Sequence, residues 1–470
     1  MSHAPANTIA IIGGGLAGLA AAVRLREHGW QVELFEARRA LGGRAASYRD
    51  PTTGELIDHC QHVSMACCTN FQDFCERTGI AEQFQRYRTL HFFAATGKRY
   101  DLRASRWLPA PLHLAPALLR QGYLTWRERL RIGSLLLQLA RTSAVETTTS
   151  PSIGQWLRDH GSTKNAIDRF WSVVLVSALG ETVDNASLAA ARKVFVDGFV
   201  VNRHGYEVDV PLRSLRELFD EQVAARLQQQ GVNIHRQTPL QQLHGDASGV
   251  THLELAAGEQ RRFDRYLLAV PWRQAYELLS PDLQAAASEL APAATFSSSP
   301  ISGVHLWFDR PLTTLPHAVL IDRLTQWVFR REPSTTGHAA QHYYQVVISA
   351  SRDLSQLPQA SIIATVIADL QAVFPDAREA QLLASRIVTE REAVFSYRPG
   401  LDALRPRQQT AVANLLVAGD WTRTDWPATM ESAVRSGYLA AQAIVSTPTE
   451  QQQLLVLDLP RGWLAKITVG

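Results

Sequence analysis

The sequence predicts an α/β fold in which a Rossmann-like domain carries an inserted α+β domain. Two observations predict it. A buried strand, a glycine-rich turn, an apolar helix and a second strand follow one another over residues 9–36, which is the order of a βαβ unit. Alternating apolar and polar residues return at 301–308, 326–330 and 343–350, and this period of two predicts an antiparallel sheet.

Composition limits the classes to which the chain can belong. Its 470 residues are 46% hydrophobic, which is enough for two globular domains. A net charge of +3 is too small to indicate a nucleic-acid partner, although it would suit an anionic membrane surface. Residues 1–8 are polar and lead directly into the first strand, so we expect no signal peptide. No uncharged apolar run reaches the ~18 residues of a spanning helix, and we therefore expect a cytoplasmic protein.

The first glycine turn has the spacing of a dinucleotide site. Gly13, Gly15 and Gly18 fit G-x-G-x-x-G directly after the strand at 9–12. The first glycine allows a tight turn, the second lets a pyrophosphate reach the backbone, and the third lets helix and strand pack closely. The phosphates would lie at the positive end of a helix that extends to about His28.

A second glycine turn distinguishes an FAD site from an NAD site. Glu36 ends the strand at 31–35, where its carboxylate can bind a ribose hydroxyl, and Arg44 follows Gly42-Gly43 as a cation for pyrophosphate oxygens. The run resembles the E-A-R-x-x-x-G-G-R segment of the flavin amine oxidase and carotenoid desaturase superfamily. That resemblance implies an FAD-binding domain of the amine oxidase and glutathione reductase type. The expected FAD contacts in this half are Gly13, Gly15, Ala17, Gly18, Glu36, Ala37, Arg38, Gly42, Gly43 and Arg44.

Two later segments complete the expected FAD site. Residues 417–420 read Val-Ala-Gly-Asp, and a helix is expected to begin near Thr429. The resemblance implies that Gly419-Asp420 meets the ribityl chain and that the helix points its amides at the flavin ring, where negative charge is stabilised. It also implies that the backbone of Leu240 holds the adenine. The further expected contacts are Leu240, Gly419, Asp420, Thr429, Met430 and Ala433.

The predicted layout is discontinuous. The FAD-binding domain is expected at 1–100, 205–275 and 410–446, the substrate-binding domain at 101–204 and 276–409, and a C-terminal tail at 447–470. Residues 88–102 are expected to form a hairpin around Thr96-Gly97, and a helical pattern follows Leu102.

The four cysteines lie within 16 residues but indicate no metal. Cys60, Cys67, Cys68 and Cys75 contain no C-x-x-C pair, the spacing usual for zinc and iron-sulfur sites. We expect small apolar side chains that pack in the core of a protein in a reducing compartment, and no metal site.

Several segments together most resemble the hydroxysqualene dehydroxylases, once called squalene-associated FAD-dependent desaturases. They are 58–62, 108–114, 418–422 and 426–431. The chain departs from that family at His59-Cys60, where the family commonly has Asn-Gly, and at Arg423 and Asp425. The resemblance implies FAD-dependent reductive removal of the hydroxyl of hydroxysqualene to give squalene, a precursor of hopanoids and sterols. It also implies an isoprenoid lipid substrate and an electron donor that the sequence does not identify.

This chemistry needs a proton donor and apolar walls. His62 matches a family position near the flavin and is the first candidate for the donor, the alternative being a histidine that hydrogen-bonds the backbone. Asp425 is the second candidate acid, with a loop or capping role as its alternative. Gln61, Trp272 and Trp421 are expected at the substrate, although Trp421 would serve equally as a core tryptophan.

Residues 108–140 place arginines among leucines. They can lie in a membrane interface, giving peripheral contact at the inner face of the cell membrane, or form a helical lid over the substrate. The apolar stretch 454–467 can be a membrane contact or a docked terminal strand or helix.

Three other functions fit the sequence less well. A phytoene-type desaturase runs the flavin in the oxidising direction and shares the Ala-Gly-Asp ending. An amine oxidase is disfavoured because residues 421–430 lack the usual segment of that family. A non-catalytic prenyl-binding protein, like the dissociation inhibitors of prenylated GTPases, would have lost much of the flavin signature that this chain retains.

Overall fold

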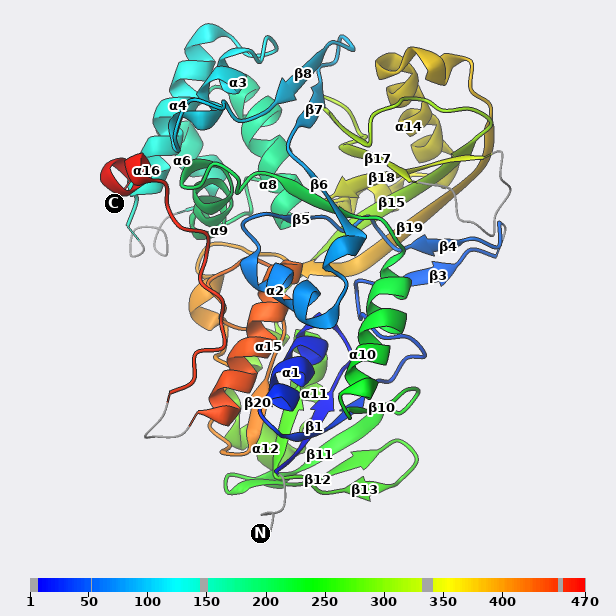
Figure 1. Ribbon diagram of the computed structural model, residues 1–470, viewed down its shortest axis with the longest axis vertical. Helices are drawn as coiled ribbons and strands as arrows, with labels where there is room; N and C mark the ends of the chain where they lie inside the picture. Colours follow the sequence, from blue (N-terminus) through cyan, green and yellow to red (C-terminus); the bar gives the residue numbers. More distant parts are fainter. Residues whose placement is uncertain (1–6, 52, 144–150, 332–340, 447–450, 470) are drawn as a thin grey trace.

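The computed structural model describes residues 7–51, 53–143, 151–331, 341–446 and 451–469. The expected start of the C-terminal tail, at 447, lies outside the described residues. A parallel sheet with its helices occupies one end of the long axis in Figure 1, and a large mixed sheet with a helical region occupies the other.

Five parallel strands form the nucleotide-binding sheet in the order β10-β2-β1-β14-β20. Segments far apart in the chain meet in it, which confirms the Rossmann-like fold. The strands are β1 (Thr8–Ile12), β2 (Gln31–Phe35), β10 (Asn233–His235), β14 (Arg265–Leu268) and β20 (Leu415–Val417).

Different partners bury the two faces of this sheet, because strand side chains point alternately to either side. Ile9 and Ile11 of β1 pack among helices, and Ala10 and Ile12 pack on the opposite face. The helices are α1 (Leu16–Glu27), α2 (Thr69–Thr78) and α15 (Met430–Val445), and the opposite face is covered by β11 (Leu240–Asp246), β12 (Gly249–Leu255), α11 (Trp272–Glu277) and α12 (Pro281–Ala286).

The large sheet has the order β19-β15-β18-β17-β16-β7-β8, and among its described strands the only parallel pair is β16–β7. One face packs on α14 (Gln359–Val373) through Val304, Leu306 and Val346. The sheet confirms the antiparallel pattern expected from the sequence. Its strands are β7 (Leu90–Phe93), β8 (Arg99–Leu102), β15 (Ser298–Phe308), β16 (His317–Leu320), β17 (Trp327–Arg331), β18 (His342–Ser349) and β19 (Leu382–Phe395).

The hairpin expected around Thr96-Gly97 joins β7 to β8. Through β16 these two strands extend the large sheet, whereas the expected boundary at residue 100 groups β7 and most of the hairpin with the FAD-binding domain. Turn signals are local, so they locate a hairpin but do not show which sheet it joins.

The chain after β8 is helical, as the pattern beyond Leu102 predicts. α4 begins with a capping box, in which Thr125 and Glu128 each bond the other's backbone N–H. The helices are η2 (Leu112–Leu114), α3 (Ala115–Leu119), α4 (Trp126–Arg141), α6 (Ile153–Asp159), α7 (Lys164–Ala166), the π-helical η3 (Ile167–Trp171), α8 (Ser172–Leu179), α9 (Leu188–Phe195) and the π-helical η4 (Val196–Val200).

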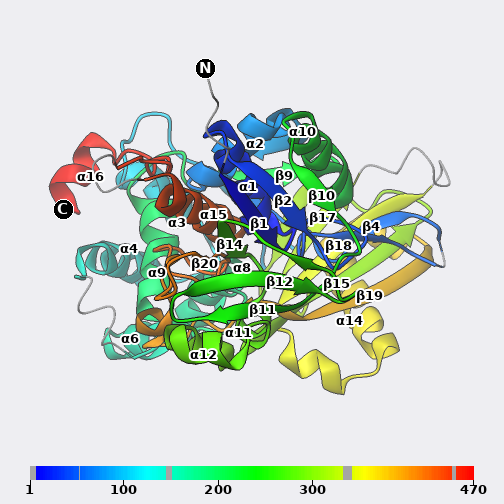
Figure 2. The same cartoon turned by 90° about the horizontal axis from the view of Figure 1, so that it is seen from below.

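Smaller elements complete the fold. They are β3 (Ser47–Arg49) with β4 (Leu56–Asp58), β5 (Ser64–Met65) and β6 (Phe84–Tyr87) with β9 (Val208–Pro211), β13 (Gln260–Arg261) beside β12, the π-helical η5 (Arg216–Val223), α10 (Ala224–Gln229), α13 (Ala291–Ala294), α16 (Trp463–Thr468) and the 3-10 turns η1 (Ala81–Gln83), η6 (Ser288–Leu290), η7 (Arg352–Gln356), η8 (Pro375–Arg378) and η9 (Leu401–Leu404). Figure 2 shows α16 at the same end as α3 and α4.

The cysteines are core side chains. All four are buried and free, and Cys67, Cys68 and Cys75 pack in the same cluster as α1 and α15. Within the described residues, no group of three His, Cys, Asp or Glu side chains is placed to hold a metal. None of the described helices has the length and apolar character needed to cross a membrane.

Candidate active site

The two glycine turns lie against each other at the end of β1. The Gly42 N–H donates to Gly14 O at 2.9 Å, and a Cβ added to Gly13 or Gly18 would collide with backbone oxygen. Gly15 differs, because the nearest protein atom to an added Cβ is Gly43 Cα at 3.9 Å. The space in front of Gly15 is therefore free for a pyrophosphate at the N-terminus of α1.

The Glu36 carboxylate closes this loop. It is 8% exposed, and it accepts hydrogen bonds from the N–H groups of Gly14 and Arg38, each at 2.8 Å. A carboxylate has about four acceptor sites, so the remaining lone pairs can accept from ribose hydroxyls. Ala37 and Arg38 follow directly on the same exposed turn.

Residues 237–240 run beside this turn. The N–H groups of Gln237 and Thr238 donate to the carbonyls of Arg38 and Glu36, at 3.1 and 2.9 Å. Leu240, half-buried, begins β11 two residues further on. The structure thus brings the expected adenine contact close to the expected ribose contact.

Arg44 and Asp420 form an ion pair at 2.6 Å, although they lie 376 residues apart. A second Arg44 nitrogen donates to Ala393 O at 2.9 Å. The Gly419 N–H donates to Ser436 Oγ at 2.8 Å, which ties this turn to α15. The two motifs that the sequence shows at opposite ends of the chain therefore form one charged corner.

The N-terminus of α15 is fixed from two sides. Thr429 caps it by accepting from Ser432 N–H at 3.2 Å, and the buried Glu431 accepts from the N–H groups of Asn70 and Phe71 at the start of α2. Met430 and Ala433 are half-buried against the same core. On the next turns, a Cβ added to Gly437 would collide with Ala17 O, so α15 and α1 are in backbone contact.

The segment 58–62 lies on the face of the large sheet opposite α14. Gln345 donates to Asp58 O at 3.4 Å, and a Cβ added to Gly303 would lie 2.7 Å from His59 O. Arg331 donates to the Gln61 amide oxygen at 3.1 Å. Gln61 is 5% exposed, and this hydrogen bond ties the segment to β17.

His62 lies with its Nδ1 3.0 Å from Cys60 O. Because a carbonyl only accepts, Nδ1 carries the proton and the neutral ring leaves Nε2 as an acceptor. Desolvation lowers the pKa of His62, although its bond to Cys60 O opposes the shift, and the positive charge of Arg44 contributes to the lowering. His62 is thus a neutral imidazole within electrostatic reach of the Arg44 corner.

The other three candidate residues are Trp272 and Trp421, which are buried, and Asp425, which is exposed on a turn. Trp272 and Trp421 are each 1% exposed and donate to backbone carbonyls, of Phe296 and Val270 at 3.1 and 3.0 Å. Trp421 also packs against Gly419. Asp425 is exposed and adopts a positive φ of 61°, the geometry of a turn residue.

Two buried charged residues near the site, Arg405 and Glu181, were not predicted from the sequence. Arg405, 1% exposed, donates to Asp420 O at 3.0 Å and Thr424 Oγ1 at 3.1 Å, and so fixes the turn after Gly419. Glu181, at the end of α8, pairs with Arg352 at 2.6 Å. Asp420, Thr424 and Arg352 lie at least 15 residues from the residue that each contacts, so spacing along the chain does not reveal these pairs.

Comparison with known proteins decides the family. The model of the flavin-containing amine oxidoreductases matches residues 16–445. The chain belongs to this family. It is accordingly a flavin-dependent oxidoreductase, and its cofactor is FAD, as the glycine turns and Arg44 predict.

Individual members of the family are similar at low identity. Hydroxysqualene dehydroxylase of Zymomonas mobilis is 27% identical over 93% of this chain and 98% of its own. The 15-cis-phytoene desaturase of Synechococcus elongatus is 26% identical over 95% and 97%, and that of Solanum lycopersicum is 26% identical over 93% and 77%.

Solved structures share the fold. An oxidoreductase from Methanosarcina mazei has a TM-score of 0.70 at 15% identity, covering 92% of this chain and 98% of its own. Cyclohexylamine oxidase from Brevibacterium oxydans has a TM-score of 0.67 at 17% identity, covering 94% and 99%.

The residues present fit FAD. Gly15 leaves room for the pyrophosphate, Glu36 has spare acceptors for the ribose, and Arg44 carries the matching positive charge. The N-terminus of α15, capped by Thr429, would stabilise the negative charge of a reduced flavin.

Proposed function

We propose that this flavoprotein acts on a C30 isoprenoid and replaces the allylic hydroxyl of hydroxysqualene with hydrogen to give squalene. The observation that carries the proposal is the position of His62, whose Nδ1 lies 3.0 Å from Cys60 O in the segment that packs on the sheet face and whose ring lies within electrostatic reach of Arg44. The end-to-end similarity to the Zymomonas mobilis dehydroxylase supports the choice of substrate.

The reaction balances as a two-electron reduction. One C–O bond breaks, one C–H bond forms at the same carbon, and the hydroxide leaves as water after it takes up a proton. FAD supplies the hydride when it is bound in its reduced form. The protein must deliver the proton, exclude bulk water and hold an apolar chain.

His62 is the residue proposed to deliver the proton. Its lowered pKa means that the protonated ring is a stronger acid than a free imidazolium, and also that fewer molecules carry it at pH 7. Gln61 holds the backbone of the segment through Arg331. Asp425 stays a second candidate acid, although its carboxylate is exposed.

Desaturation of a carotenoid precursor is the second candidate function. Phytoene desaturases are among the similar proteins, at 26% identity, and the free Nε2 of neutral His62 suits a proton acceptor. In that direction the oxidised flavin removes hydride and the base removes the proton.

An anaerobic experiment separates the two reactions. Chemically reduced protein is mixed with hydroxysqualene, oxidised protein with squalene or phytoene, and the products are identified by mass spectrometry. The dehydroxylase proposal expects one squalene for each flavin reoxidised. Formation of a more unsaturated polyene by oxidised protein, without squalene from reduced protein, would assign the desaturase instead.

We also propose peripheral contact with an anionic lipid surface, which would give a water-insoluble substrate access to the protein. Residues 103–141 contain seven arginines and one acid, Glu128, in a chain with a net charge of +3. Trp107, Trp126 and Trp463 are 90%, 63% and 65% exposed. The proposed dehydroxylation also requires an electron donor that reduces the flavin.

A further inference from the structure

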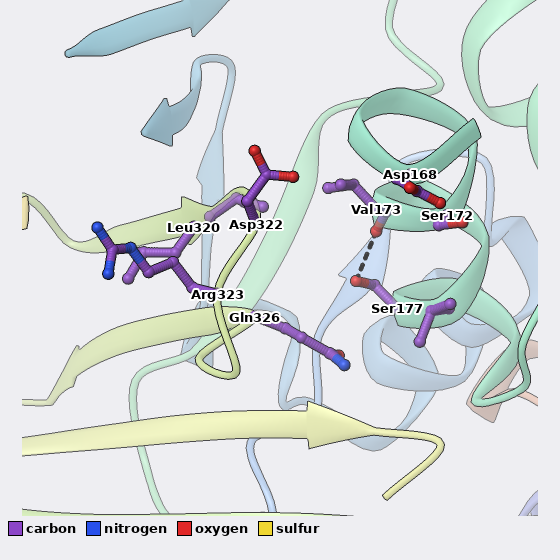
Figure 3. A pocket seen from close by; sticks show the side chains of 10 residues that line it. Asp168, Ser172, Val173, Ser177, Leu320, Asp322, Arg323 and Gln326 are labelled. Carbon is purple, nitrogen blue, oxygen red and sulfur yellow. Dashed lines mark hydrogen bonds between the residues drawn. The ribbon is translucent and has the colours of Figure 1, made fainter. Parts of the chain in front are cut away.

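A pocket of about 380 Å³ lies between α8 and the connection from β16 to β17. In Figure 3 its two walls face each other, and the side chains of Asp322 and Gln326 point toward the helix while Arg323 points away. The lining residues are Asp168, Ser172, Val173, Val176, Ser177, Val319, Leu320, Asp322, Arg323 and Gln326.

Most polar side chains of this pocket are already paired with other protein groups, so apolar side chains supply much of the surface left for a ligand. Val173 and Val176 are only half-buried, although they belong to the strongly apolar helix α8. The pairs are Arg323 with Ala95 O (2.9 Å) and Asp369 (3.4 Å), Gln326 with the backbone of Ser349 (3.1 and 2.9 Å), Ser177 with Val173 O and Trp327 Nε1 (2.8 Å each), and Asp322 with Arg169 (2.7 Å).

Helix α8 connects this pocket to the flavin site. Its first turns line the pocket, and at its other end Ser299 Oγ donates to Gly180 O at 2.5 Å. A Cβ added to Gly180 would lie 2.7 Å from Val394, and the neighbouring Ala393 O accepts from Arg44. Eight helical residues span about 12 Å, so the pocket lies roughly one short helix away from the Arg44 corner.

Two backbone irregularities also meet at this pocket. η3, on the helix side, is π-helical, and Asp322, on the other side, has a positive φ of 60°. The Arg169–Asp322 ion pair joins the two. Such irregularities cost free energy and recur at functional sites.

We propose that this pocket holds the terminal isoprenoid unit of the substrate while the reacting carbon lies at the flavin, and that Val176 limits the chain length that fits. The inference rests on the proposed function for the substrate class, and it holds equally for a dehydroxylase and for a desaturase. A branched hydrocarbon end matches a half-exposed valine wall whose polar neighbours are engaged elsewhere.

The test measures isoprenoid binding to the oxidised holoprotein by the change in flavin absorbance. Val176→Phe should fill the pocket and weaken squalene binding at least about tenfold, while binding of geraniol, a C10 chain one isoprenoid unit too short to reach the pocket from the reacting position, stays within about threefold. Val176→Ala at the same position should leave both affinities within about threefold. FAD content and the unfolding midpoint of each variant show whether it is folded.

Val173→Phe fills the same pocket from the preceding turn of α8. It is a second, independent variant in case Val176→Phe does not fold. Equal squalene affinity in wild type and both phenylalanine variants would overturn the pocket assignment. If wild type binds none of squalene, phytoene and hydroxysqualene, both the pocket and the proposed function fail. If these ligands bind with the expected length dependence but hydroxysqualene is not reduced, only the proposed dehydroxylation fails.

Discussion

At the residue scale, each glycine of the first turn has its own physical constraint. Added Cβ atoms on Gly13 and Gly18 collide with protein backbone, whereas an added Cβ on Gly15 comes only to ordinary contact distance of Gly43 Cα. The same G-x-G-x-x-G spacing therefore includes two positions that protect the fold and one that faces the cofactor.

Gly15→Ala should leave the unfolding midpoint of the protein without FAD almost unchanged, because Gly15 has an ordinary extended backbone with φ of −74°. It should weaken FAD binding, since the new methyl group occupies the pyrophosphate path. Gly18→Ala should lower the unfolding midpoint, because its methyl group would collide with a backbone oxygen. Thermal unfolding and FAD titration of both variants measure these effects, and equal destabilisation by the two would contradict this division.

Glu36→Ala should weaken FAD binding by roughly 1.5 to 3 kcal/mol, the usual loss for hydrogen bonds to a charged acceptor. The variant also frees the N–H groups of Gly14 and Arg38. Glu33→Ala on the same strand is the matched control, because Glu33 pairs with His235 and Arg261 instead. Fluorescence titration gives both affinities, and an unchanged FAD affinity in Glu36→Ala would remove Glu36 from the site.

His62→Phe should slow turnover by about 10² to 10⁴ if His62 is the acid, with FAD still bound. Because the pKa of His62 is lowered from 6.5, the acid form gains population only below that value. The rate of dehydroxylation should therefore rise as pH falls below 6.5, and this rise should vanish in the variant. Full rate with bound flavin would make His62 structural and direct attention to Asp425.

At the element scale, the C-terminal helix α16 packs against the arginine-rich segment at 103–141. It packs through Ala465 against Ala110 and Ala140, and Arg141 donates to Thr468 O at 2.9 Å. Trp463 and Ile467 remain exposed on it. α16 thus lies beside the arginine-rich segment, from which the sequence separates it by more than 300 residues (Figures 1 and 2), whereas Leu454, at the start of the second apolar stretch, packs in the cluster of α1 and α15.

The protein should float with anionic liposomes, and less so at high salt, because arginines and exposed tryptophans attract it to the headgroup layer. Combined Trp107→Ser, Trp126→Ser and Trp463→Ser should abolish flotation. Leu383→Ser, which changes a residue 45% exposed on β19, is the control. Flotation of the triple variant at the level of wild type would rule out this surface.

At the scale of the whole molecule, buried histidines make stability depend on pH. His113, His305 and His317 are at most 2% exposed, and desolvation lowers their pKa values to about 4, 3 and 4. The unfolded chain binds protons at these sites below pH 6.5, before the folded protein does.

The free energy of unfolding should accordingly be highest above pH 6.5 and should fall as pH decreases toward 4. Each such histidine contributes a slope of up to about 1.4 kcal/mol per pH unit. His113→Leu should reduce the slope, because it removes one of these buried titrating groups. Urea unfolding at several pH values measures it, and a flat profile from pH 7 to 4.5 would contradict the prediction.

The sequence by itself determined the Rossmann-like domain and its FAD cofactor, because the spacing of Gly13, Gly15 and Gly18 is set by one turn of backbone between a strand and a helix and Glu36 follows the next strand. The pairing of Arg44 with Asp420, the sheet that the β7–β8 hairpin joins, and the acceptor nitrogen of His62 were decided by the tertiary structure. Each depends on groups that meet only after distant segments pack. Local periodicity constrains neighbours along the chain, and it carries no information about which distant surface a side chain will face.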